Sequence, residues 1–95
     1  MGTVNISFHS VKDDSGIQVA NMPPLLSENV TSSGTSAQSS AAPAYSEVVR
    51  VAPDTTVRIL TGTDPTALAS SVRMKADTVE YFTVKVGDKV AEIDE

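Results

Sequence analysis

Nearly all of the expected core residues lie in the stretch 45–94, which reads YSEVVRVAPDTTVRILTGTDPTALASSVRMKADTVEYFTVKVGDKVAEID. Apolar and polar residues alternate through the runs in this stretch, which is the period of a strand with one buried face. Most of the apolar residues are β-branched, and such side chains fit the pleated surface of a sheet. Turn residues separate five predicted strands, which lie at 47–52, 55–61, 72–74, 78–86 and 89–94. This spacing predicts an all-β fold, a small antiparallel β-sandwich or barrel.

The run TVEYFTVKV at 78–86 is the strongest predicted strand. We expect Phe82 and Val84 to point into the core, and Tyr81 to be partly buried with its hydroxyl toward solvent or a partner. Gly87-Asp88 has the composition of a two-residue primed turn. It therefore predicts a hairpin between 78–86 and 89–94.

The N-terminal third contains a further strand, TVNISFHSV at 3–11, in which Val4, Ile6 and Phe8 share one face. Turn residues at 12–16 and a short apolar run at 17–20 predict a hairpin with it. The apolar face of the first strand must be covered, and the sequence leaves three candidates open: the β domain, a sister subunit or another protein.

Residues 31–44, TSSGTSAQSSAAPA, carry no charge and no large apolar side chain, which predicts a flexible linker. The predicted organisation is therefore an N-terminal strand and hairpin arm at 1–30, this linker, and a β-sandwich domain at 45–95. We expect the β domain to fold without the arm.

Composition limits the possible functions. The 95 residues contain four aromatic side chains and no Cys, so the core is thin and no disulfide can reinforce it. Contacts with partner chains are then the remaining source of buried area, which indicates an oligomer or an assembly component. The net charge of −5 is spread over both halves, which disfavours nucleic-acid binding, and no apolar run is long enough to predict a membrane span.

No catalytic, cofactor-binding or metal-binding residues are predicted. His9 is the only histidine and would have to be the base of any Ser-His-Asp triad, but it lies on the polar face of a predicted strand. The acidic pairs at 13–14 and 94–95 lack the ligand spacing of a calcium loop. We therefore expect a protein that is not an enzyme and that needs no cofactor.

Three arginines lie on predicted strands, at Arg50, Arg58 and Arg73. They are interpreted either as solvent-facing charges that discourage aggregation of sheet edges, or as partners in salt bridges between subunits. The candidate interaction residues are Val4, Ile6, Phe8, Arg50, Arg58, Arg73 and Tyr81.

The segment 47–93, about half of the chain, resembles small structural proteins of tailed bacteriophages that are encoded near the capsid genes. The resemblance lies in EVVRVA, TTVRILTGTDPTA, the Ser-rich loop after it, VRM and DTVEYFTVKVGDKVAEI. It implies a non-enzymatic capsid decoration or cement protein, made in the host cytoplasm and located on the capsid surface of the virion. It also implies binding to the major capsid protein and a homo-oligomer, with a trimer favoured.

A phage tail or fibre adhesin module that binds host surface glycans is the alternative. Such a module should present exposed aromatic residues on loops, for stacking on sugars. Tyr81 and Phe82 instead lie in the middle of a predicted strand, so the sequence favours the decoration protein.

Overall fold

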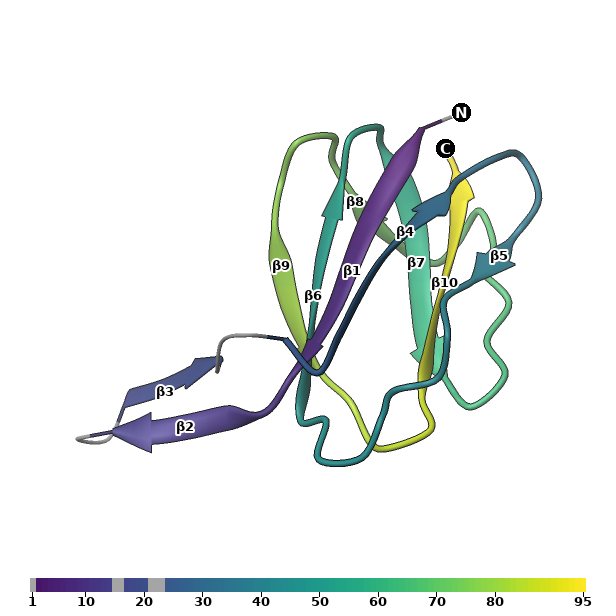
Figure 1. Ribbon diagram of the computed structural model, residues 1–95. Coiled ribbons are helices and arrows are strands. Elements are labelled where there is room, and N and C mark those ends of the chain that lie inside the picture. The colour runs from purple at the N-terminus through teal and green to yellow at the C-terminus, as the bar shows by residue number, and fades with distance from the viewer. Residues whose placement is uncertain (1, 15–16, 21–23) are drawn as a thin grey trace.

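The structure, a computed structural model, describes residues 2–14, 17–20 and 24–95. These residues form ten strands, with no helix among them, in two four-stranded antiparallel sheets and one two-stranded hairpin (Figure 1). The first sheet has the order β4 (Leu26–Thr31), β1 (Thr3–His9), β6 (Val48–Pro53), β9 (Glu80–Thr83). The second has the order β5 (Ala37–Gln38), β10 (Lys89–Asp94), β7 (Val57–Gly62), β8 (Val72–Met74), and the hairpin joins β2 (Val11–Asp14) to β3 (Ile17–Ala20). The predicted small β-sandwich is confirmed, and the fold is not a closed barrel.

Strand β1 lies inside the first sheet and pairs antiparallel with β4 on one edge and β6 on the other. Its alternate side chains Val4, Ile6 and Phe8 are fully buried. The apolar face of β1 is thus covered by the second sheet of the same chain, which belongs to the β domain, the first of the three candidates. The segment expected to form an arm thus supplies two of the four strands of the first sheet, β1 and β4, and only β2–β3 projects from the sandwich.

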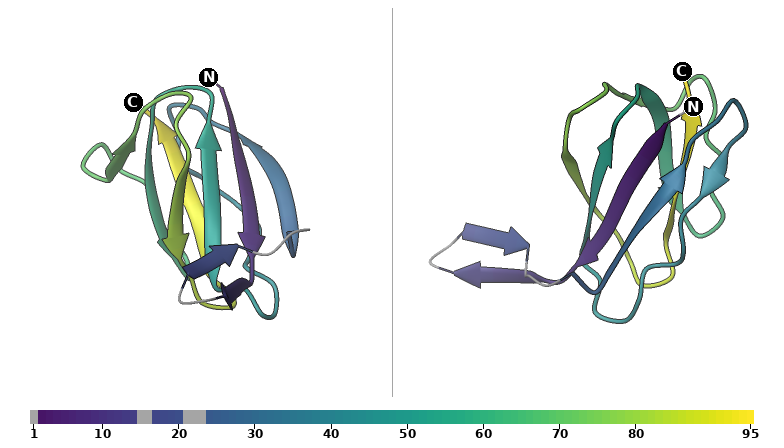
Figure 2. Two further views of the ribbon diagram at one scale, coloured as in Figure 1. Left: turned by 90° about the vertical axis from the view of Figure 1, so that its left-hand side faces the viewer. Right: turned by 45° about the horizontal axis from the view of Figure 1, so that its top comes forward.

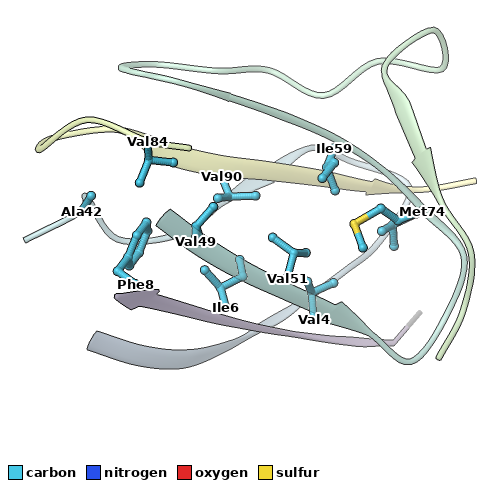
Figure 3. Close-up of a cluster of buried hydrophobic side chains, with 11 residues drawn as sticks. Val4, Ile6, Phe8, Ala42, Val49, Val51, Ile59, Met74, Val84 and Val90 are labelled. Atoms are coloured by element: carbon cyan, nitrogen blue, oxygen red, sulfur yellow. The ribbon is translucent and has the colours of Figure 1, made fainter. Parts of the chain in front are cut away.

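The core lies between the two sheets, where their inward side chains meet (Figure 3). Strand β6 contributes Val49 and Val51, and β7 contributes Val57 and Ile59, so each strand turns one of its two alternating faces inward. The whole cluster consists of Val4, Ile6, Phe8, Ala42, Val49, Val51, Val57, Ile59, Met74, Val84 and Val90.

The predicted hairpin between 78–86 and 89–94 is wrong. Strand β9 pairs with β6 and β10 pairs with β7, so the two strands belong to different sheets. A turn does form, because the Asp88 amide donates to the Lys85 carbonyl over 3.0 Å and Gly87 has a φ of 92°. This turn carries the chain from one sheet to the other, and β9 is shortened to four residues.

In the predicted 78–86 strand, Phe82 and Val84 point toward the core as expected, but they are buried to different extents. Val84 is buried, and Phe82 is partly buried against the core. Tyr81 points to the other side and keeps 54% of its surface exposed.

The segment 31–44, predicted to be a flexible linker, is packed on the sandwich, and Ser32, Ser39 and Ala42 are buried. Thr31 ends β4 in the first sheet, whereas β5 pairs with β10 in the second. The Ser39 amide donates to the Val90 carbonyl over 2.8 Å, and the Ser39 hydroxyl accepts from the Val90 amide over 2.9 Å. Small side chains allow the backbone to approach β10 closely, and these hydrogen bonds hold a segment that supplies only Ala42 to the core cluster.

We expect Phe8→Ala to lower the free energy of unfolding by about 3–5 kcal/mol, because it leaves a cavity in the core where Phe8 is fully buried. Phe82→Ala should cost less, since Phe82 is only partly buried. Urea denaturation of both variants measures the difference. A larger loss for Phe82→Ala would contradict the central position of β1.

Candidate functional site

The outer face of the first sheet is polar because the inner positions of its strands hold the apolar residues. Alternation along β1 places Asn5, Ser7 and His9 on this outer face. The register sets Ser7 opposite Ser27 on β4 and opposite Arg50 on β6. Tyr81 on β9 lies opposite Arg50. Four strands thus contribute one polar row, and two of the predicted interaction residues, Arg50 and Tyr81, are neighbours in it.

A pocket of about 260 Å³ opens on this face. Its lining residues are Asn5, Ser7, His9, Pro24, Ser27, Arg50 and Tyr81. Ser7 and His9 are 4% and 3% exposed and lie deepest, while Tyr81 is largely exposed at the side. We refer to this feature as the outer-face pocket.

Hydrogen bonds hold the polar groups of the outer-face pocket in place. An Arg50 guanidinium nitrogen donates to the Asn5 side-chain oxygen over 3.2 Å. The Asn5 amide nitrogen in turn donates to the Asn29 side-chain oxygen over 2.9 Å. This chain of contacts across three strands orients Arg50 along the sheet, and leaves most of its donors without a protein acceptor in the part of the chain that is described.

Ser7 and His9 were not predicted to act together. They lie two residues apart on the same face of β1, with 2.9 Å between the Ser7 Oγ and the His9 Nε2. Hydrolases activate a serine by such a contact, but they also require a substrate to reach the hydroxyl and donors that stabilise an oxyanion. Ser7 and His9 are both buried residues, and both line the outer-face pocket. The spacing i, i+2 on a half-buried strand is the sequence signal that could have found it.

Arg58 and Arg73 are cross-strand neighbours on β7 and β8. The Glu95 carboxylate lies 3.8 Å from the Arg58 Nε and forms an ion pair with Arg73. Arg58 also donates to the Ser71 carbonyl over 3.2 Å. The two arginines therefore have an acidic partner within the chain, and salt bridges from them to another subunit stay a prediction.

The remaining candidate interaction residues, Val4, Ile6 and Phe8, lie in the core and present no surface to a partner. Their burial explains the strict alternation of the N-terminal run, because this pattern reflects the inner face of a sheet.

The β2–β3 hairpin projects from the sandwich in Figure 1 and in the right-hand view of Figure 2. The predicted strand at 17–20 is confirmed, but it pairs with β2 and not with the first strand. Residues 12–14 of the predicted turn belong to β2, and residues 15–16 lie outside the described residues. At its base the Val11 amide donates to a Glu47 carboxylate oxygen over 3.1 Å. The molecule measures 41 Å along its longest axis against 25 and 21 Å along the others.

One ionisable side chain, Glu92 on β10, is fully buried on the same face of its strand as Val90. Neither of its carboxylate oxygens has a hydrogen-bond partner among the described residues. The Glu28 carboxylate on the facing sheet is held by the Ser40 amide over 2.6 Å and the Ser40 hydroxyl over 2.9 Å. Burial, and secondly the charge of Glu28, raises the pKa of Glu92 to about 8.

This pKa predicts how stability depends on pH. The folded state holds the Glu92 proton more tightly than the unfolded chain, in which the pKa of Glu92 is near 4.5. The stabilising contribution is therefore complete below about pH 4.5 and is lost as the pH rises through about 8. Asp94 titrates in a different range, because a hydrogen bond from the Ser32 side chain lowers its pKa.

We expect Glu92→Gln to gain stability relative to the parent protein as the pH rises from 5 to 9, since the variant has no carboxyl group to ionise. Urea unfolding at intervals across this range measures the effect. Glu80→Gln is the matched control, because Glu80 is exposed and should leave the difference constant. Parallel curves for the parent and Glu92→Gln would contradict the burial of this carboxyl group.

Comparison with protein-family models, with curated proteins and with solved structures finds no match to this chain. Within the described residues, no group of three His, Cys, Asp or Glu side chains is placed to hold a metal ion, and no helix could cross a membrane. Function is therefore inferred from the hairpin, the outer-face pocket and the sequence resemblance.

Proposed function

We propose that this protein is a non-enzymatic structural protein of a tailed bacteriophage, which decorates the capsid and attaches to it through the β2–β3 hairpin. The observation that supports the proposal is a two-stranded hairpin that projects from an otherwise complete sandwich. The resemblance of 47–93 to small virion proteins points to the same class of protein.

The hairpin pairs only within itself in the described chain. An isolated two-stranded hairpin is marginally stable in water, so a surface that covers it would stabilise it. Each of its strands has an outer edge that can add to a sheet of another protein, and strand addition is a common mode of recognition. The major capsid protein is the partner that we propose for it.

The remainder of the fold supports attachment at this end. Figure 1 shows both chain ends at the end of the sandwich away from the hairpin. Docking of the hairpin therefore leaves the opposite end of the sandwich directed away from the capsid. The sandwich has a core of its own, so its folding would not depend on the contact between the hairpin and the capsid.

Replacing residues 11–23 with Asn-Gly tests the hairpin directly. Strands β1 and β4 are already antiparallel neighbours, with Phe8 opposite Leu26, so a two-residue turn can join them after Ser10. The variant also carries Pro24→Thr, because the N–H that closes such a turn is missing in proline. We expect the variant to keep the thermal midpoint of the parent within a few degrees and to lose co-sedimentation with capsids that lack the protein. The capsids should come from the phage that encodes the chain.

Equal binding of the folded variant and the parent would contradict attachment through the hairpin. Failure of the parent itself to bind would contradict the decoration function as a whole. A variant with two substitutions on the second sheet, Arg58→Gln and Arg73→Gln, is the control and should still bind, because these residues lie away from the hairpin.

We further propose that the protein forms a closed homo-oligomer, with a trimer as the expected state. The side of the sandwich between β8 and β9 supports this, because apolar residues there are exposed: Val72 by 59%, Val79 by 45% and Leu60 by 44%. A small cavity of about 110 Å³ lies among Ile59, Leu60, Thr61, Val72 and Phe82 on the same side. A second copy would bury this surface and extend the unpaired edge of β9.

Light scattering coupled to size exclusion measures this association. We expect the mass of three chains for the parent, and of one chain for Val72→Lys, because a charge at this position opposes burial. Val86→Lys is the matched control, since Val86 is equally exposed but lies in the turn after β9. A monomeric parent would contradict the oligomer, and a Val72→Lys variant with the parent mass would contradict this interface.

A further inference from the structure

The outer-face pocket has an uneven charge. Of its lining residues, Arg50 carries a permanent positive charge and none is acidic. The described chain places no carboxylate within ion-pair distance of Arg50, although the protein as a whole carries a net charge of −5. Arg58 and Arg73, by contrast, share the Glu95 carboxylate. The outer-face pocket is therefore suited to an anionic group supplied from outside the chain.

The guanidinium group is held in a defined position. One of its nitrogens donates to Asn5, and the other donors remain for a ligand. A planar guanidinium binds a carboxylate through two parallel hydrogen bonds, a geometry that a single ammonium charge does not offer. A carboxylate is therefore the anion that fits best.

The other polar residues of the pocket bear hydroxyl, amide or imidazole groups, which include both donors and acceptors of hydrogen bonds. They are Asn5, Ser7, His9, Ser27 and Tyr81. Ligand hydroxyl groups also donate and accept, so they can satisfy such a lining, whereas an acidic amino-acid side chain offers acceptors only. The exposed ring of Tyr81 provides an apolar face beside these groups. The volume of about 260 Å³ lies below the range of most ligand pockets and admits a single small ring.

We propose that the outer-face pocket binds one acidic sugar unit of a glycan. Arg50 binds the sugar carboxylate, Tyr81 packs against the ring, and Asn5 and Ser27 bind its hydroxyl groups. This activity is separate from attachment through the hairpin, because the pocket lies on the outer face of the first sheet and the hairpin is not among its lining residues. A protein with both features would link a particle at one site to a glycan at the other.

The test is an NMR titration of the amide spectrum with four small probes. D-glucuronate and N-acetylneuraminate are the acidic sugars, D-glucose lacks the carboxylate, and acetate has only the carboxylate. We expect at least one of the two acidic sugars to shift the amide signals of Asn5, Ser7, Arg50 and Tyr81. Glucose and acetate should bind at least tenfold more weakly.

Two variants locate the effect. Arg50→Gln should weaken binding of the acidic sugar at least tenfold, and Arg58→Gln, on the other sheet, should leave it unchanged. If Arg50→Gln does not fold, Tyr81→Ala replaces it, since Tyr81 is exposed and outside the core. The variant that lacks the hairpin should bind the sugar as the parent does.

Each other outcome overturns the proposal. Acetate that binds as well as the acidic sugars would show a carboxylate site without sugar recognition, as for an acidic peptide. Glucose that binds equally well would remove the role of Arg50. Shifts outside the pocket, or no shifts with either acidic sugar, would show that the pocket is not a glycan site.

Discussion

Strand β1 uses both of its edges and both of its faces. Its edges pair with β4 and β6, which join the N-terminal and C-terminal parts of the chain in one sheet. Its inner face supplies Val4, Ile6 and Phe8 to the core, and its outer face supplies the buried Ser7 and His9. In a protein of 95 residues with four aromatic side chains, so large a share of the buried surface cannot be replaced from elsewhere.

Periodicity predicted the strands that have one buried face. In β6 and β7 the inward residues Val49, Val51, Val57 and Ile59 alternate with polar or exposed ones, so the pattern reflects burial directly. The sequence indicated a turn in this region, but it did not show that the turn at 85–88 joins two different sheets. A Gly-Asp turn reverses the chain equally well within a sheet and between sheets, and only long-range packing decides which sheet the next strand joins.

Order in residues 31–44 could not be read from the sequence, because it depends on backbone hydrogen bonds to β10 and on the small size of Ser39 and Ala42. The outer-face pocket could not be predicted from the sequence either, because it also depends on contacts between distant parts of the chain. Alternation assigns residues to faces but does not set the register between strands, so Arg50 and Tyr81 appeared as separate candidates. The burial of Glu92 left a local signal, since it lies two residues after Val90 on the same face of β10.

With β1 and β4 built into the sandwich, the projecting hairpin and the outer-face pocket are the features that the core does not require, and both proposed functions rest on them. Without β1 and β4 the first sheet keeps two of its four strands, so residues 45–95 should not fold alone. Amide dispersion in the NMR spectrum of a 45–95 fragment measures this most directly. We expect the narrow spectrum of an unfolded chain, because β6 would lose β1 and the core would lose Val4, Ile6 and Phe8. A dispersed spectrum with a cooperative thermal transition would contradict it.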